Sequence, residues 1–229
     1  NEEVSVESAF TSIGSFAIVG EPLGVFYGTA WERDANGNKL IGANGRPIIA
    51  AEQKNIGSPL PNWFAGLRNT FDYKDFTFSF LFDFRNGGDV WNGTKARMNN
   101  IGISADSEDR ERTFVVDGVY APGTSIGGVD VSGQTNTTAI SALTYWRQVK
   151  GDGGGASEEF VETVNWVRLR DVSLAYRFDW SKKNWGVQFL NLSFVARNLW
   201  LSTNYTGVDP ETSLTGAGSN IGGLDYFNN

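Results

Sequence analysis

The sequence predicts an all-β fold of antiparallel strands, and three observations support this prediction. Apolar residues recur at every second position in several segments, which is the repeat of a strand and not that of a helix. Of the 229 residues, 28 are glycine and 14% are aromatic, a composition that suits strands and turns better than helices. Short and long connections alternate along the chain between these segments. An up-and-down sheet would therefore carry its short turns at one end and its long loops at the other.

Five strands are expected along the chain. In the first, Leu23, Val25, Tyr27, Thr29 and Trp31 alternate with Gly24, Phe26, Gly28 and Ala30. In the second, the alternation runs from Trp63 to Tyr73, and a turn of two residues separates it from the third. The expected strands cover about residues 17–32, 63–73, 76–91, 164–178 and 189–203.

The third strand has the purest alternation. A phenylalanine occupies every second position from 76 to 84, and mostly polar residues stand between these rings. Successive side chains of a strand point to opposite faces, so one face of this strand is entirely aromatic. The residues expected to face lipid are Phe76, Phe78, Phe80, Phe82 and Phe84.

The fourth and fifth strands alternate less purely. Apolar residues fall on even positions in 172–178 and again in 190–196. The alternation slips near Leu169 and Arg170, which predicts a β-bulge at that point of the fourth strand.

Long loops are expected at residues 33–62, 92–163 and 204–229. Soluble domains rarely carry loops of this length, whereas outer-membrane barrels combine short periplasmic turns with long extracellular loops. Five strands are too few to close a membrane barrel, which needs about eight, and open edges in lipid leave backbone groups unpaired. The sequence therefore predicts part of a larger transmembrane barrel, with the lipid bilayer and the rest of the barrel as its neighbours.

Tryptophans provide a second test of this topology. When the chain is threaded up and down through the five strands, one tryptophan of each strand falls at the long-loop end, where an aromatic girdle would meet the lipid headgroups. The expected girdle residues are Trp31, Trp63, Trp91, Trp166 and Trp200. The alternative interpretation is that these rings cap the core of a soluble sandwich.

Composition argues against several classes of function. The net charge of −7 is the opposite of a nucleic-acid-binding surface. Cysteine and histidine are both absent from the sequence, which removes disulfides, thiolate nucleophiles and the usual general base. Asp209 and Glu211 could be interpreted as an acid/base pair or a cation site, but their spacing alone does not position them for hydrolysis. We therefore expect no enzyme, no metal site and no cofactor.

Four blocks of sequence resemble one family. Residues 55–76 are similar to the signature "IGNPNPKW…GLTNTFSYKGF" of SusC/RagA-type TonB-dependent outer-membrane transporters, and residues 20–28 are similar to that family's "GxPLGxFYGY". Residues 165–176 look like "SFLRLKNLTLGYTLP", and residues 196–211 look like "GQNLFTxTKYTGYDPE". The blocks occur in the family's order. The turn after Phe178 departs from the family because it lacks the usual proline.

The resemblance implies the C-terminal portion of a barrel of the 22-stranded type with a plug inside. The plug, the segment that contacts TonB and the closing strand are expected to lie outside this sequence. The family imports glycans or oligopeptides into bacteria across the outer membrane, usually with a SusD-like surface lipoprotein that covers the extracellular loops. A barrel that serves as a structural subunit of a larger outer-membrane assembly, without transport, is the alternative.

Two sets of loop residues are candidates for binding. Planar rings and forked donors suit sugar faces and peptide backbones, and the long loop carries such groups at Arg97, Asn99, Tyr145, Trp146 and Arg147. These side chains could equally pack the loop against its neighbours or against a lid protein. Within the resemblance, a second set belongs to a loop-shaping motif, at Tyr205, Gly207, Asp209, Pro210 and Glu211.

Overall fold

The computed structural model describes residues 3–9, 13–179, 186, 188–211 and 222–227. The chain divides into two compact units. The sheet unit comprises Pro61–Gly88 and Val164–Tyr205, and the loop unit comprises Asn1–Leu60, Asp89–Thr163 and Thr206–Asn229. In the part of the chain that is described, no helix is long and apolar enough to cross a membrane.

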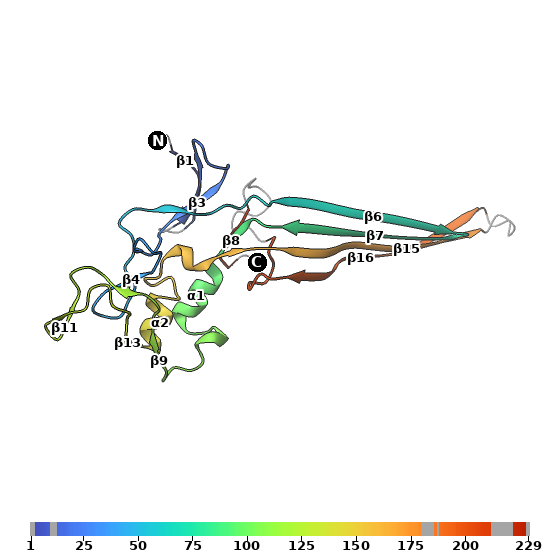
Figure 1. Cartoon of the computed structure of the whole chain (residues 1–229). Coiled ribbons are helices and arrows are strands. Elements are labelled where there is room, and N and C mark those ends of the chain that lie inside the picture. Colours follow the sequence, from blue (N-terminus) through green and yellow to red (C-terminus); the bar gives the residue numbers. More distant parts are fainter. Residues whose placement is uncertain (1–2, 10–12, 180–185, 187, 212–221, 228–229) are drawn as a thin grey trace. The chain divides into compact units, whose positions relative to one another are not determined.

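Four long strands form the sheet unit (Figure 1). They are β6 (Trp63–Tyr73), β7 (Phe76–Asn86), β15 (Trp166–Asp179) and β16 (Phe189–Thr203). They pair antiparallel in the order β16-β15-β7-β6. Lys74, in the turn between β6 and β7, has a φ of 53°, the left-handed conformation that tight hairpin turns use.

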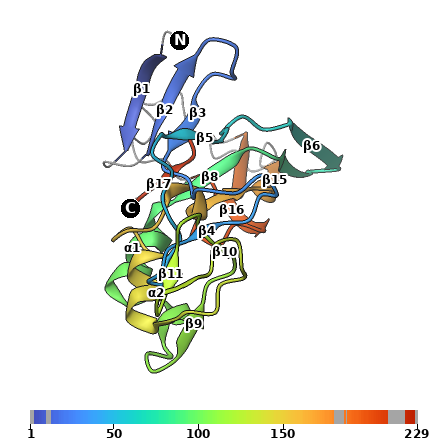
Figure 2. The same ribbon diagram turned by 60° about the vertical axis from the view of Figure 1, so that its left-hand side comes forward.

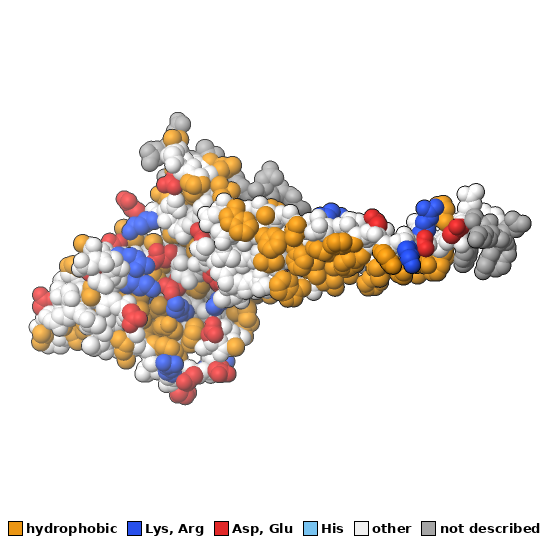
Figure 3. All heavy atoms as spheres, turned by 45° about the vertical axis from the view of Figure 1, so that its right-hand side comes forward, with side chains coloured by type: hydrophobic (Ala, Val, Ile, Leu, Met, Phe, Trp, Pro, Cys, Tyr) orange, Lys and Arg blue, Asp and Glu red, His pale blue; other side chains and the backbone are white. Residues whose placement is uncertain are grey.

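The register places the aromatic residues of β7 on one face of this sheet. Directly opposed residues of an antiparallel pair share a face, and one row across the four strands consists of Phe71, Phe78, Leu174 and Phe194. All five alternating phenylalanines of β7 lie on this apolar face. Figure 3 shows hydrophobic side chains gathered along the strands.

β15 contains the bulge that the sequence predicts. Its register shifts between Leu169 and Asp171, whose partners Phe82 and Leu81 are adjacent on β7. The additional residue changes which positions of β15 face the apolar side. Before the bulge these are the odd positions, such as Val167 and Leu169, and after it they are the even positions, such as Val172 and Leu174. Trp166 consequently lies on the polar face.

Short strands and two helices form the loop unit (Figure 2). One antiparallel sheet has the order β1-β2-β3-β5. A second sheet is mixed and has the order β14-β8-β17, with β17 parallel to β8, and three further pairs are two-stranded. The strands are β1 (Glu3–Ala9), β2 (Ile13–Ile18), β3 (Val25–Gly28), β4 (Leu40–Ile41), β5 (Lys54–Gly57), β8 (Asp89–Asn92), β9 (Thr113–Val115), β10 (Val119–Tyr120), β11 (Ser125–Ile126), β12 (Val129–Asp130), β13 (Ala139–Ser141), β14 (Val161–Thr163) and β17 (Leu224–Asp225). The helices are α1 (Gly93–Ile101) and α2 (Ala142–Gln148), with the 3₁₀ turns η1 (Ala105–Ser107) and η2 (Ser157–Phe160).

The single strand expected over residues 17–32 is wrong. β2 ends at Ile18, and β3 covers only Val25–Gly28. Between them Gly20 and Gly24 adopt positive φ values of 92° and 82°, and the chain reverses so that β2 and β3 pair antiparallel. Glycine adopts this left-handed conformation without a steric penalty, which is why the alternation breaks here.

The structure also differs from the expected strand over residues 76–91 and from the expected loop over residues 92–163. The strand expected over residues 76–91 stops at Asn86, because Gly87 and Gly88 have positive φ values of 76° and 83° and lead into the separate strand β8. The long loop expected over residues 92–163 contains both helices and several short strands. It is a folded segment and not an irregular connection.

The core of the described chain lies in the loop unit, as two hydrophobic clusters. The first joins β2, β3 and β8 to α1, and its buried members are Ile13, Phe26, Trp91, Ala96, Phe160 and Leu224. The second contains Trp31, Ile41, Val116, Tyr120, Ile140, Val149 and Ala156. Each cluster joins segments that lie far apart in the sequence.

Candidate functional site

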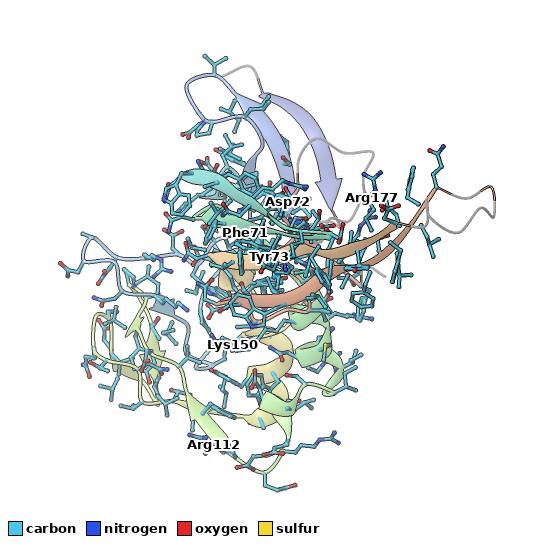
Figure 4. All side chains as sticks on the ribbon, turned by 90° about the vertical axis from the view of Figure 1, so that its right-hand side faces the viewer. Phe71, Asp72, Tyr73, Arg112, Lys150 and Arg177 are labelled. Carbon is cyan, nitrogen blue, oxygen red and sulfur yellow. The ribbon has the colours of Figure 1, made fainter. Side chains whose placement is uncertain are left out.

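The apolar face of the sheet unit is open. On β6, Phe71 and Tyr73 belong to this face and are exposed, while Asp72 between them belongs to the opposite one (Figure 4). No described residue of the sheet unit forms a second layer over the face. Its exposed large side chains are Trp63, Leu67, Phe71, Tyr73, Phe76, Phe78, Leu174, Leu190, Leu192, Phe194 and Trp200. An apolar surface of this extent marks contact with a membrane or with another protein.

The opposite face of the same sheet carries the charged side chains, some of them paired with one another, beside the exposed apolar side chains Phe64, Val195 and Leu199. Asp83 accepts a hydrogen bond from Nε of Arg170 at 2.8 Å, and Arg197 lies 3.7 Å from the carboxylate of Asp171. The guanidinium of Arg170 also lies 5.7 Å from the centre of the Trp166 ring, a cation–π distance. The sheet therefore separates two chemically different surfaces, as the alternation in the sequence predicts.

Of the five tryptophans expected in a girdle, two are exposed on the apolar face and three are buried. Trp63 and Trp200 lie on the apolar face, each 51% exposed. Trp31 and Trp91 are instead buried in the two clusters of the loop unit, where packing within the unit replaces contact with headgroups. Trp166 is buried on the polar face because the bulge in β15 reverses its orientation. The girdle assignment is therefore wrong for three of the five rings.

The candidate binding residues of the long loop lie on the two helices, which contact each other. Two of these residues are occupied by interactions within the loop unit. Arg97 lies 3.6 Å from the carboxylate of Asp152, and the ring of Tyr145 stacks on Phe114 with centroids 4.0 Å apart. Both contacts are within the loop unit and agree with the alternative role of packing the loop against its neighbours.

The other three candidates line one cavity of about 190 Å³. Asn99 is buried, and its Nδ2 donates to the backbone carbonyl of Lys150 at 2.7 Å. Trp146 and Arg147 come from α2, and Nε of Arg147 donates to Oδ1 of Asn100 at 3.3 Å. The fold thus brings residues almost fifty positions apart to one place. Alternation and motif spacing did not indicate Arg110 or Ser107, which line the same cavity.

Two backbone N–H groups of the family-motif loop donate hydrogen bonds to side chains two positions earlier in the chain. The backbone N–H of Tyr205, a buried residue, donates to Oγ1 of Thr203 at 3.0 Å. Asp209 accepts from the backbone N–H of Glu211 at 2.9 Å across the buried Pro210, a turn that a side-chain carboxylate commonly stabilises. Gly207 is half-buried.

A charged cluster that the sequence did not indicate lies beside the second hydrophobic cluster. The two carboxylate oxygens of Glu159 accept from Nε1 of Trp31 at 2.8 Å, from Lys39 at 2.8 Å and from Lys150. Burial alone would raise the pKa of Glu159, but the hydrogen bonds and charges of Lys150 and Lys39 outweigh it and lower the pKa to about 2. The Glu159 carboxylate is a structural ion that holds Trp31 in place.

Comparison with known proteins relates the chain to one class of receptor. No family model matches the sequence. Three proteins of Formosa agariphila are similar to it: TonB-dependent receptor P39 (29% identical over 188 residues, 78% of this chain and 15% of the receptor), receptor P26 (28% over 239 residues, 96% and 22%) and receptor P3 (25% over 232 residues, 90% and 21%). The chain thus spans about a fifth or less of the length of these relatives. The relationship to TonB-dependent receptors that the motifs imply is confirmed, as is the all-β architecture.

Proposed function

We propose that this chain forms part of a SusC/RagA-type receptor that imports glycans or oligopeptides across a bacterial outer membrane. In this proposal the sheet unit is a segment of the wall of a multi-pass, 22-stranded barrel. Its apolar face contacts lipid, and its polar face lines the interior that holds the plug. The chain acts by binding and gating and not as an enzyme.

The partners in this proposal follow from the same arrangement. TonB acts on the plug from the periplasm through a segment outside this sequence. A SusD-like lipoprotein closes over the extracellular loops and traps the substrate. Opening and closing of this lid, together with displacement of the plug, would control access. The similarity to three TonB-dependent receptors supports the TonB-linked part of this scheme.

The observation that carries the proposal is the two-faced sheet. A soluble protein would cover a wall of phenylalanine and leucine with a second layer, whereas the described sheet unit leaves it open. The strands β6 and β16 form the two edges of the sheet. In lipid each unpaired edge group costs several kcal/mol, so both edges need neighbouring strands, which a closed barrel would provide.

A pair of double variants tests the proposed orientation. Phe78→Asp with Phe80→Asp places two charges on the apolar face, where a charged side chain is destabilising near the bilayer midplane, by about 2–4 kcal/mol for arginine or lysine and by less for aspartate. We expect this variant of the complete receptor to fail in membrane assembly, measured as the amount of heat-modifiable, folded receptor in outer-membrane fractions.

The matched control changes the two neighbouring positions of the same strand. Ser79→Asp with Leu81→Asp adds the same charges to the polar face, and assembly should fall much less. Equal losses in the two variants would contradict the assignment of the faces. Uptake of labelled oligosaccharides or peptides by cells carrying the assembled receptor then separates an importer from a structural subunit without transport.

A further inference from the structure

The cavity between α1 and α2 has the features of a binding site. The two helices pack against each other in the loop unit (Figures 1 and 2). The cavity lies where the C-terminal end of α1 meets α2, and it encloses about 190 Å³. This volume is below the roughly 300–1,000 Å³ of sites for drug-sized ligands, so the cavity fits one residue of a longer ligand.

Positive charge dominates the polar part of this cavity. The guanidinium groups of Arg110 and Arg147 both line it, and no carboxylate does among the described residues. Arg110 donates through Nη2 to the carbonyl of Gly102 at 3.1 Å, and Arg147 uses Nε on Asn100. Each bond fixes one nitrogen and leaves other N–H groups of the fork for a ligand. A carboxylate is the group that such forks bind best.

Part of the lining is apolar, beside the polar side chains of Asn99, Asn100 and Ser107. Ile101 and Leu143 border the cavity and are 50% and 66% exposed, and Trp146 contributes a ring. Exposed aliphatic side chains around a cavity favour an apolar ligand group. These walls would pack against an apolar amino-acid side chain of the ligand.

Two buried polar atoms of the cavity residues also lack partners. Oδ1 of Asn99 and Nε1 of Trp146 make no hydrogen bond with any described residue, although Asn99 is only 2% exposed. An unpaired buried acceptor or donor destabilises the fold. A peptide group carries the complementary donor and acceptor.

We propose that this cavity binds the C-terminal residue of an oligopeptide. The terminal carboxylate pairs with Arg110 and Arg147, and an apolar side chain packs against Ile101, Leu143 and Trp146. The proposal rests on the import function proposed above and narrows the substrate class to peptides with a free, apolar C-terminus.

Binding to the complete receptor in detergent tests this assignment. The probe is a tetra-alanine peptide extended by a C-terminal leucine, compared as free acid and as amide by isothermal titration calorimetry. We expect the free acid to bind about tenfold more tightly, because the amide cannot form the charged fork pair. Arg110→Gln and Arg147→Gln should each abolish this preference, and Arg147→Lys should keep part of it.

Arg112→Gln is the matched control. Arg112 follows Arg110 by two positions, but its guanidinium lies 5.0 Å from the centre of the Phe114 ring, and the residue does not line the cavity. This variant should retain the preference for the free acid. The content of folded, heat-modifiable receptor verifies that each variant has assembled.

Three results would overturn the assignment: equal affinity for acid and amide, no binding of either peptide, or an acid preference that survives both glutamine variants. A neutral oligosaccharide that binds and is weakened by Arg147→Gln would make the cavity a sugar site. These results leave the import proposal intact if uptake persists. Conversely, equal assembly losses in the two double variants of β7 would contradict the barrel orientation without affecting peptide binding.

Discussion

Glu159 shows how one ionised side chain can organise a folded loop. Its oxygens bind the ring of Trp31 and the side chain of Lys39, both more than 100 positions away, together with the nearby Lys150. Because its pKa is lowered from 4.5 to about 2, the ionised form is the one that the fold stabilises. The resulting stability is fully present above about pH 4.5, and it is lost as the pH falls from there towards 2.

Replacing Glu159 by glutamine should therefore destabilise the loop unit at neutral pH. The shift in pKa corresponds to at most roughly 3 kcal/mol. We expect a lower free energy of unfolding for the Glu159→Gln receptor at pH 7, measured by denaturant titration of tryptophan fluorescence. The difference from the natural receptor should shrink below pH 4.5, because protonated Glu159 no longer attracts the lysines.

The control for this measurement is Glu52→Gln, which removes an exposed carboxylate. It should leave the unfolding free energy unchanged within about 0.5 kcal/mol. A difference between the Glu159→Gln and natural receptors that is constant from pH 7 to pH 3 would show that the glutamate acts through its shape and not through its charge.

At the scale of elements, α1 is fixed at its start by Asn92. Oδ1 of this buried side chain accepts from the backbone N–H of Lys95 at 2.9 Å, and Nδ2 donates to Glu162 at 3.0 Å and Thr206 at 3.2 Å. The first bond caps the helix, and the other two tie it to β14 and to the segment after β16. Helix and loop are therefore held by the same side chain.

Asn92→Ala should loosen α1 more than an ordinary cap deletion does. Loss of a cap costs about 1 kcal/mol, and the buried partners left behind add about 1–3 kcal/mol. We expect faster hydrogen exchange at the α1 amides, followed by mass spectrometry. Ser141→Ala removes the exposed cap of α2, whose Oγ accepts from Thr144 at 3.3 Å, and should change exchange less. A larger effect at Ser141 would contradict this account.

The elements differ in how far the sequence predicts them. β6, β7, β15 and β16 are visible in the alternation, and the slip at Leu169 and Arg170 reveals the bulge, because each depends on neighbouring residues alone. The helices α1 and α2 have nine and seven residues, too few for a clear apolar period. The residue types in these segments therefore indicated candidate binding residues, but the sequence did not predict the helices that carry them.

Tertiary contacts explain the remaining errors. Burial of Trp31 depends on Glu159, 128 positions away, and no local pattern reports such a contact. The sequence likewise supplied three of the residues that line the cavity but missed Arg110 and Ser107, which reach it through the turn after α1. Single residues were correctly placed on a face wherever the strand register was regular.

At the scale of the whole molecule, the two faces of the sheet should meet different surroundings. Leu192 lies on the apolar face, and Asn191 beside it lies on the polar face. The sequence contains no cysteine, so a single introduced thiol can carry a probe at either position. The same strand thus provides both the test and its control.

A fluorophore attached to Leu192→Cys should be quenched by brominated lipid in reconstituted vesicles. The same fluorophore on Asn191→Cys should be quenched several-fold less, because it faces the barrel interior. The complete receptor must be free of other cysteines. Equal quenching at the two positions would mean that both sides of β16 contact lipid, which no closed barrel allows.

The separate hydrophobic clusters of the loop unit have a consequence for how such receptors diversify. In the proposed barrel the strands of the sheet unit contact hydrocarbon on one side along their whole length, which restricts nearly every second position. The loop unit carries its own interior, so substitutions around the cavity need only satisfy local packing. Descendants of one ancestral receptor could therefore acquire new cargo preferences by remodelling this part while inheriting the membrane anchorage unchanged.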